Sequence, residues 1–405
     1  MGKKEVTVAL FLAWRTLVRG KRSEILACVL ITSLIFTSMI FFPALVNGIG
    51  QDLTQQVVDY QTSDILVEPK QGNQYIYKLP STLDLINRIP GVLRASPHYE
   101  MGATLIFRGR FVNTMVHAIK PRDEKAVSPL YTTMVAGNYL GDSDTGNVII
   151  GSQAAGSRDL YEPQGYGSSL GGVRVGDSVV IDYANNFRKE YQVKGIYTTG
   201  NTDVDSRVYI SWAEMEKVTG KTLDYAPYIM VRIKDDYSDQ AVINQILQYG
   251  ITTRVRTAAD VIAQEQPGVF MGYPAIGSVF FVVSLVIAAL VFFIFVRKKT
   301  AGDRRQVGIR KALGMDTPVI IHSYGFQAVL LSAAGILLGC VITGLVMVCI
   351  SFFSLVTSGS STFFSVTPAD LAFNGSILFL VSVLAGYIPA VLVSRENIEC
   401  TGRMV

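Results

Sequence analysis

Long apolar runs divide the chain and give the first indication of its organisation. No residue in 267–296 carries a charge, none in 317–369 does, and a further uncharged run covers 25–46. A helix needs about 20 consecutive apolar residues to cross a bilayer, so each of these runs is long enough. The pattern predicts an α-helical membrane protein whose first membrane helix is far in sequence from the others.

The run that starts at residue 318 extends to about residue 356, which is too long for one ordinary crossing and just long enough for two. A hairpin here would leave the serine-rich segment 354–370 in the cytoplasm without a single Lys or Arg, against the positive-inside rule. One long third helix is therefore expected, followed by an external loop at 357–370. The predicted membrane helices, in a 1+3 arrangement, are 25–49, 269–296, 318–356 and 371–394.

The first 24 residues carry an apolar pattern at helical spacing, mixed with Arg15 and Arg19. This pattern favours an amphipathic helix that lies in the membrane interface on the cytoplasmic side. The membrane helix that follows has no small-residue cleavage pattern, so it is expected to be a retained anchor rather than a signal peptide. The apolar positions of the amphipathic helix are Val8, Leu10, Phe11, Trp14, Leu17 and Val18.

Charged residues make up 17% of the chain and are unevenly distributed. Residues 50–269 hold 21 Lys and Arg against 25 Asp and Glu, whereas the rest of the chain holds 15 against 7. Because Lys and Arg collect on the cytoplasmic side of membrane proteins, both termini, including the tail 395–405, are predicted to be cytoplasmic. The segment 50–268 is then a large extracytoplasmic domain inserted between the first and second membrane helices, whose outer ends are expected to form a stalk.

The extracytoplasmic segment reads as an α+β domain held together by its own core. Stretches of alternating polarity such as DSVVIDY and YIMVRI predict strands, and a glycine-rich stretch at 161–177 is expected to be a flexible loop. Two subdomains are expected, an α/β part from 50–120 and 225–260, and a β-rich part inserted at 121–224. The segment has no disulfide framework, because the cysteines all lie outside it, at Cys28, Cys340, Cys349 and Cys400.

A glycine-punctuated basic segment, RRQVGIRKALGM, fills most of the predicted cytoplasmic loop 297–317. Wound as a helix, it would present Ile309 and Leu313 on one face and Arg304 and Arg310 on the other, with Gly308 leaving room for close approach. The pattern is typical of a docking element for a cytoplasmic partner. The residues predicted to form it are Arg304, Arg305, Val307, Gly308, Ile309, Arg310, Lys311, Ala312, Leu313 and Gly314.

Patterns for catalysis and metal binding are weak. The histidines His98, His117 and His322 are far apart and lack the HExxH spacing of a metal site, so structural hydrogen-bonding roles are expected. The segment GKT at 220–222 resembles the end of a phosphate-binding loop, but Met215 stands where an earlier glycine is needed. We therefore expect no catalytic residue, no metal site and no cofactor in this chain.

Small residues recur along one line of the third predicted membrane helix. A face of this kind lets a second helix approach closely, either from another copy of the chain or from the same bundle. A dimer interface is the favoured interpretation, with ordinary packing inside the bundle as the alternative. The residues concerned are Ser332, Gly335, Gly339 and Gly344.

Several segments together carry a family resemblance. The loop RRQVGIRKALGM resembles the cytoplasmic loop of the MacB/FtsX/LolC-LolE permease superfamily, also called type VII ABC transporters. The stretches VGDSVVIDYANNFRKEYQVKGIYTTG and LDLINRIPGVLRASPHY are similar to parts of the MacB-type periplasmic core domain. AWRTLVRGKRSEIL and LAGYIPAVLVSRENIE are similar to the first and last segments of the family.

The resemblance implies a permease subunit that pairs with a second copy or a paralogue. Only 24 residues precede the first predicted span, too few for an ATPase fused in front of it as in MacB. A separate pair of cytoplasmic ABC ATPase subunits would therefore bind ATP and Mg beneath the membrane. Motion of the ATPases would pass through the loop to the extracytoplasmic domain. The implied location is the bacterial cytoplasmic (inner) membrane, and no nucleic acid is expected among the partners.

The resemblance leaves the cargo open. The size of the extracytoplasmic domain, which is closer to that of MacB and LolC than to that of FtsX, favours transport, and the loop leans toward MacB-like export of a substrate, with or without a membrane-fusion adaptor protein. Lipoprotein release of the LolC/LolE kind and FtsX-like control of a cell-wall hydrolase are the alternatives. A receptor or scaffold without an ATPase would explain the extracytoplasmic domain but not the basic loop.

Overall fold

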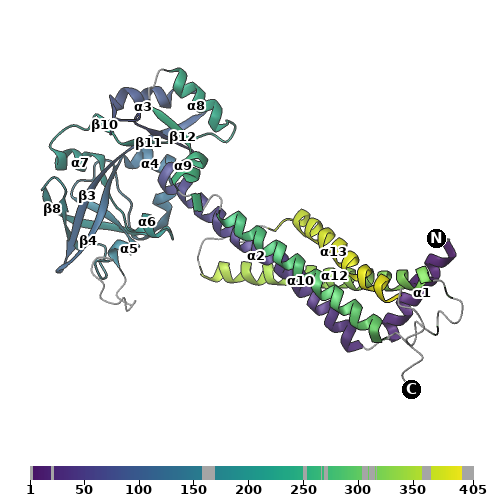
Figure 1. The fold of residues 1–405 in the computed structure, drawn as a ribbon. Helices are drawn as coiled ribbons and strands as arrows, with labels where there is room; N and C mark the ends of the chain where they lie inside the picture. The colour runs from purple at the N-terminus through teal and green to yellow at the C-terminus, as the bar shows by residue number, and fades with distance from the viewer. Residues whose placement is uncertain are drawn as a thin grey trace. The chain divides into compact units, whose positions relative to one another are not determined.

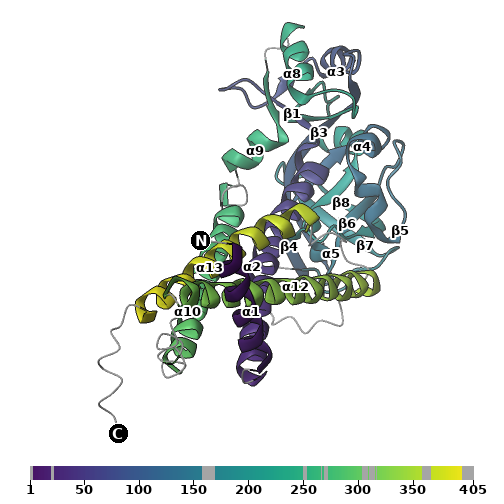
Figure 2. The same ribbon diagram turned by 90° about the vertical axis from the view of Figure 1, so that its right-hand side faces the viewer.

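The computed structural model describes residues 3–19, 22–156, 169–249, 253–265, 267–268, 272–302, 309, 315, 317–357 and 366–394. The chain forms two compact units (Figures 1 and 2). One unit combines Met1–Asp52 with Met271–Val405 and is called the membrane unit below. The other, Leu53–Phe270, is called the external unit.

Among the described residues of the membrane unit, four helices are long and apolar enough to cross a bilayer. The predicted 1+3 arrangement is confirmed, because the external unit separates the first of these helices from the other three. The third is a single helix of 41 residues, so the alternative of a cytoplasmic hairpin is excluded. The helices of this unit are α1 (Lys3–Arg19), α2 (Arg22–Val57), α10 (Tyr273–Gly302), α12 (Thr317–Thr357) and α13 (Pro368–Ser394).

The predicted amphipathic helix is present as α1. Phe11, Trp14 and Val18 are exposed on it, whereas Ala9 and Ala13 are buried. Exposed apolar side chains are costly in water and favourable at a membrane surface, so this face fits the expected position in the interface.

The external unit is an α+β structure. The residues that the structure describes form two sheets and several short helices. The strands are β1 (Ile65–Glu68), β2 (Ile76–Tyr77), β3 (Val92–Phe107), β4 (Arg110–Ile119), β5 (Met134–Gly137), β6 (Asn147–Gly151), β7 (Ser178–Tyr183), β8 (Arg188–Tyr197), β9 (Val208–Ser211), β10 (Tyr225–Ala226), β11 (Tyr228–Ile233) and β12 (Arg254–Thr257). The helices are η1 (Val58–Thr62), α3 (Leu79–Asn87), α4 (Pro121–Val127), η2 (Pro129–Thr133), α5 (Ser152–Ala155), α6 (Thr202–Asp205), α7 (Trp212–Thr219), α8 (Asp239–Gln248) and α9 (Ala258–Glu265).

Strand β3 connects the two parts of the large sheet, because its two halves pair with different strands. Its first half pairs with β11, which continues through β1 to β12, all antiparallel. Its second half pairs with β4 and β7. From there, the pairings of β4 with β9, β9 with β6, β6 with β8 and β8 with β7 close a ring of six strands. The ring removes most free sheet edges, as closure does in small barrels.

Helices cover the first half of the sheet, where α3 and α8 lie on the same side of β11 and β12 (Figure 1). Both helices bury one apolar face, with Leu83 and Ile86 on α3 and Val242 and Ile246 on α8. The Ser238 hydroxyl caps α8 by accepting a hydrogen bond from the Ala241 amide, which fixes the start of this helix.

The observed strand pairing does not divide at residue 120, which is the expected boundary between the two subdomains. An α/β half does combine segments from both flanks, since β1 pairs with β11 and β12. However, β4 and the second half of β3 pair with β9 and β7, which belong to the predicted insertion. The physical reason is the length of β3, whose 16 residues are enough to serve both halves.

Candidate functional site

Helices α12 and α2 pack closely against one another in the membrane unit. A Cβ atom added to Gly335 would lie 2.6 Å from Thr32 Cβ, and one added to Gly339 would lie 2.6 Å from Phe36 Cδ1 and 3.1 Å from the Ser33 carbonyl oxygen. The two distances of 2.6 Å are shorter than real Cβ atoms show, and the distance of 3.1 Å is tight. Glycine at these two positions therefore lets the two helix backbones approach, as small residues do in membrane helices generally.

Polar groups add weak links along the same contact. The Thr37 hydroxyl donates a hydrogen bond of 3.4 Å to the Gly339 carbonyl oxygen, and the Thr343 hydroxyl donates one of 3.4 Å to Thr37 Oγ1. Hydrogen bonds between membrane helices are worth only about 0.6 kcal/mol on average, so shape fit is the main contribution to this contact.

The line of small residues is therefore used within the bundle at two of its four positions. Gly335 and Gly339 face α2 of the same chain, which is the packing alternative considered for them. Ser332 is buried, and its hydroxyl bonds the Val329 carbonyl oxygen of its own helix. Gly344 differs, because a Cβ atom there would meet no other atom within 4 Å.

A further glycine contact, at Gly386 of α13, was missed by sequence reasoning. A Cβ atom at Gly386 would lie 2.8 Å from Ala328 Cβ on α12 and 3.4 Å from Val296 Cγ2 on α10. The signal that could have found it is the spacing of Ser382, Gly386 and Ala390, three small residues four positions apart on one face of a helix. The three C-terminal membrane helices meet at this point.

The predicted docking loop joins α10 to α12, and of its ten residues the structure describes Ile309 alone. Ile309 is 54% exposed. After the loop, Met315 packs with Ile320 and Tyr324 at the start of α12. The docking role itself stays a prediction, because Arg304, Arg305, Val307, Gly308, Arg310, Lys311, Ala312, Leu313 and Gly314 lie outside the described residues.

Two of the three histidines form a buried polar cluster in the external unit, where the two halves of β3 meet. His98 Nε2 lies 2.9 Å from Glu124 Oε2, and the Ser96 hydroxyl donates to the same carboxylate oxygen at 2.8 Å. His117 Nδ1 lies 3.3 Å from Glu100 Oε1, which also accepts a hydrogen bond of 2.5 Å from the Tyr228 hydroxyl. Each histidine therefore lies beside a carboxylate, but the expected hydrogen-bonding role is not met, because no ring nitrogen of His98 or His117 forms a hydrogen bond in the described structure.

Burial holds the pKa of His117 well below its ordinary value of 6.5, and the positive charge of Arg207 and the neighbouring His98 add to the effect. Burial also raises the pKa of Tyr228, with the Glu100 carboxylate as the second cause. The imidazole of His117 is therefore neutral in the folded chain at neutral pH.

We expect acidification to destabilise the external unit through His117. Since the pKa of His117 is lower in the folded chain than in the unfolded chain, its contribution to stability is full above pH 6.5 and is lost as the pH falls below that value. One proton can change the free energy of unfolding by about 1.4 kcal/mol per pH unit. Chemical denaturation between pH 7 and pH 5, followed by Trp212 fluorescence in a Trp14→Phe background, should show a shallower slope for His117→Gln; equal slopes would contradict this assignment.

The GKT segment and His322, the remaining sequence features with a possible chemical role, have structural roles in the fold. Gly220, at the start of GKT, is the C-cap of α7 with φ of 68°, so this segment ends a helix instead of cradling a phosphate before one. The ring nitrogen Nδ1 of His322 lies 2.6 Å from the Pro318 carbonyl oxygen on its own helix. Among the described residues, no group of three or more His, Cys, Asp or Glu side chains is arranged to hold a metal ion.

Two family models match the chain in succession. The MacB-like periplasmic core domain matches residues 27–249, and the FtsX-like permease C-terminal domain matches residues 278–398. The loop between α10 and α12 lies inside the second match. A comparison with curated proteins gave no match.

Solved structures with low identity are also similar to the chain. The periplasmic region of MacB from Actinobacillus actinomycetemcomitans is 13% identical, over 52% of this chain and 94% of that one, with a TM-score of 0.38. The extracellular domain of the ABC-type transporter YknZ from Gram-positive bacteria is 13% identical, over 50% of this chain and 94% of that one, with a TM-score of 0.33. TM-scores this low do not establish a shared fold.

The two models fit the observed order of elements, in which an α+β unit follows the first membrane helix and three membrane helices come after it. Since the first model by itself covers more than half of the sequence, the chain belongs to the MacB/FtsX-type family of ABC transporter permeases.

Proposed function

We propose that the chain is the permease subunit that transmits the motion of a separate cytoplasmic ABC ATPase to its external unit, where work is done to export or extract a substrate. The observation that carries this proposal is the division of the chain into two compact units, with the external one inserted between the first and second membrane helices. A unit attached to two membrane helices can be moved by both of them.

The chemistry of the membrane helices supports motion in preference to a polar channel. The apolar runs in all four membrane helices lack Asp, Glu, Lys and Arg, whereas ion and proton pathways through membranes usually contain such residues. A substrate handled outside the membrane needs no aqueous path between these helices. The bundle is instead closely packed at Gly335, Gly339 and Gly386, which suits helices that move as a group.

In this mechanism the cytoplasmic loop receives the motion. The basic side chains of Arg304, Arg310 and Lys311 would attract an acidic or carbonyl-rich groove on the ATPase, while Ile309 and Leu313 would provide the apolar contact. Binding and release of ATP by the ATPase pair would tilt α10 and α12 through this loop. Pairing with a second permease copy or a paralogue is part of the proposal, and a membrane-fusion adaptor is compatible with it.

Co-purification tests the proposal directly. The tagged chain, expressed with a candidate ABC ATPase encoded beside it, is expected to bring down that ATPase and to change its rate of ATP hydrolysis. Recovery of the chain alone with every candidate would instead favour the receptor or scaffold alternative.

The proposed orientation places the external unit outside the cytoplasmic membrane and both termini inside. A cysteine introduced at Ser178, which is exposed at the start of β7, should react with a membrane-impermeant thiol reagent in intact cells or spheroplasts. Cys400 should react only after the membrane is opened. Labelling of Cys400 but not of residue 178 in intact cells would reverse the assigned orientation.

A further inference from the structure

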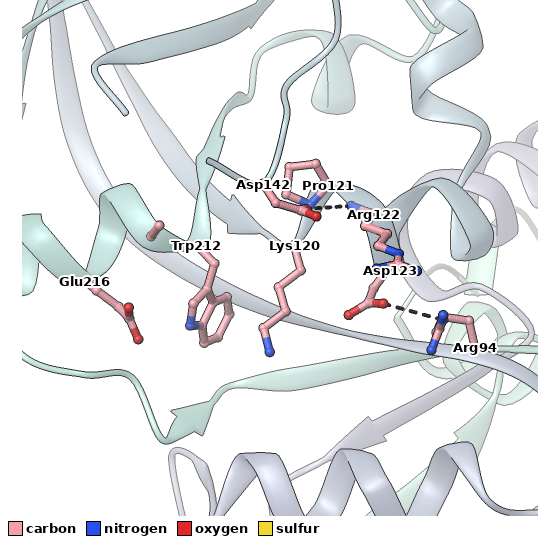
Figure 3. A pocket seen from close by; sticks show the side chains of 9 residues that line it. Arg94, Lys120, Pro121, Arg122, Asp123, Asp142, Trp212 and Glu216 are labelled. Carbon is pink, nitrogen blue, oxygen red and sulfur yellow. Dashed lines mark hydrogen bonds and ion pairs between the residues drawn. The ribbon is translucent and has the colours of Figure 1, made fainter. Parts of the chain in front are cut away.

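A polar cavity of about 530 Å³ lies in the external unit where the end of β4, the start of α4, β3 and α7 meet (Figure 3). Its volume is in the range of small-ligand sites, which is roughly 300–1,000 Å³. The cavity is separate from the histidine cluster. It is also independent of the proposed coupling to an ATPase, because every residue that lines it belongs to the external unit.

Trp212 provides the aromatic wall of this cavity. It is the first residue of α7 and is held there by Ser211, whose hydroxyl caps the helix by accepting a hydrogen bond from the Glu214 amide. Lys120 Nζ lies 5.7 Å from the centre of the Trp212 ring, and Figure 3 shows the lysine side chain between Trp212 and Asp123. A cation in this position is held partly by the ring face, which leaves its other side open.

The carboxylates around the cavity already have partners. The Asp123 carboxylate pairs with Arg94 at 3.4 Å, and Asp142 Oδ1 accepts a hydrogen bond of 2.9 Å from the Arg122 backbone amide. Glu216 Oε1 accepts one of 3.1 Å from the Leu223 amide.

The cations differ from the carboxylates in this respect. Within the part of the chain that the structure describes, neither the Lys120 ammonium nor the Arg122 guanidinium forms an ion pair with a carboxylate. The lining therefore offers two cations without a direct ion pair beside an aromatic wall, although both also attract the Asp123 carboxylate at longer range. Each carboxylate also keeps an oxygen that can accept a further hydrogen bond.

We propose that this cavity binds a short peptide segment that carries a carboxylate. The ligand carboxylate would pair with Lys120 and Arg122, and a neighbouring apolar side chain would lie against the Trp212 ring. Peptide N–H groups would donate to the remaining oxygens of Asp142 and Glu216. Such a ligand would pair with the cations and also with the carboxylates of the lining, whereas an apolar compound would leave these groups without partners.

The carboxylates of the lining argue against a polyanion. Asp123, Asp142 and Glu216 balance the three cations, so a phosphate group or the surface of an anionic membrane would meet repulsion as well as attraction. A single carboxylate flanked by N–H donors suits this balance. Such a group is found in peptides and proteins and also in free amino acids, and the experiment separates these sources.

Tryptophan fluorescence gives a direct test, because the chain has two tryptophans and Trp14→Phe leaves Trp212 as the only one. The full-length protein in detergent, without an ATPase or nucleotide, is titrated with the blocked tetrapeptide acetyl-Leu-Asp-Ala-Leu-amide. We expect a saturable change in Trp212 emission, and at least tenfold weaker binding of the matched peptide with Asn in place of Asp. Equal binding of the two peptides would overturn the proposal.

Variants locate the binding in the cavity. Lys120→Gln and Arg122→Gln should each weaken peptide binding at least tenfold, whereas Lys217→Gln, on the exposed side of α7, should leave it unchanged. Unchanged far-ultraviolet circular dichroism of the ligand-free variants shows that they are folded, because loss of the Lys120 charge beside Trp212 can by itself alter the emission. Binding that survives both cavity substitutions would overturn the proposal.

Competition separates the possible ligand sources. Free aspartate, inorganic phosphate and vesicles that contain anionic phospholipid should each bind at least tenfold more weakly than the peptide. Equal or tighter binding of free aspartate would make this a site for amino acids, and equal or tighter binding of phosphate or vesicles would make it a site for anions or lipids; either result would overturn the assignment to peptide.

Discussion

Replacing Gly335 with leucine is expected to destabilise the membrane unit by about 3 kcal/mol, the upper end of the usual cost of overpacking. The reason is the contact with α2, where a Cβ atom at this position would lie 2.6 Å from both Cβ and Cγ2 of Thr32. Thr32 Cβ is attached directly to the helix backbone, so the clash cannot be relieved by rotation of a side chain. The two helices must separate, and the Gly339 contact one turn further along is weakened with them. Denaturation of the purified protein in mixed micelles measures the change.

Gly344→Leu is the matched control on the same helix. A Cβ atom at Gly344 meets nothing within 4 Å, and leucine favours helix over glycine by about 0.8 kcal/mol. The free energy of unfolding of the Gly344→Leu variant should therefore equal that of the unmodified protein or be slightly higher. If the two substitutions cost the same, glycine at position 335 is not needed for the contact between α2 and α12.

Replacing Leu313 with aspartate is expected to uncouple the permease from its ATPase while leaving its insertion into the membrane intact. An unpaired carboxylate buried at the contact would cost several kcal/mol, whereas removal of one exposed charge, as in Arg304→Ala, should cost about 0.2–1 kcal/mol. Co-purification and stimulated ATP hydrolysis are the measurements. Arg304→Ala is the matched control from the other face of the predicted helix.

The alternative for this loop is a basic helix that lies on anionic lipid, with Leu313 dipping into the interface. In that case Leu313→Asp would weaken contact with the membrane and leave ATPase binding and activity intact. That outcome would remove the loop from the coupling mechanism.

The membrane helices could be predicted from the sequence because their physical cause is local. The apolar run up to residue 356 is continuous, and the absence of Lys and Arg in the segment that follows argued correctly for one long α12. The use of the small residues could not be predicted in the same way. The line through Gly335 and Gly339 shows that some helix approaches, but nothing in the sequence says whether that helix is α2 or a second chain.

In the external unit, short alternating stretches indicated strands, but their pairing depends on residues far apart in sequence. β3 pairs with β11 through its first half and with β4 and β7 through its second, and no local pattern marks the change. The cavity has the same origin, since Arg94 lies on β3, Lys120 between β4 and α4, and Trp212 on α7. Their types alone, an arginine, a lysine and a tryptophan in a polar context, carry no signal of a shared site.

The central claim is that an ATPase moves the external unit through the membrane helices, and a distance measured between the two units tests it most directly. Spin labels at Ser178→Cys in the external unit and Gly344→Cys in α12, after replacement of the native cysteines, report that distance by double electron–electron resonance. With the ATPase bound, addition of ATP and vanadate is predicted to shift the distance distribution, and Leu313→Asp is predicted to abolish the shift. An identical distribution with and without nucleotide, in a complex that hydrolyses ATP, would contradict the account.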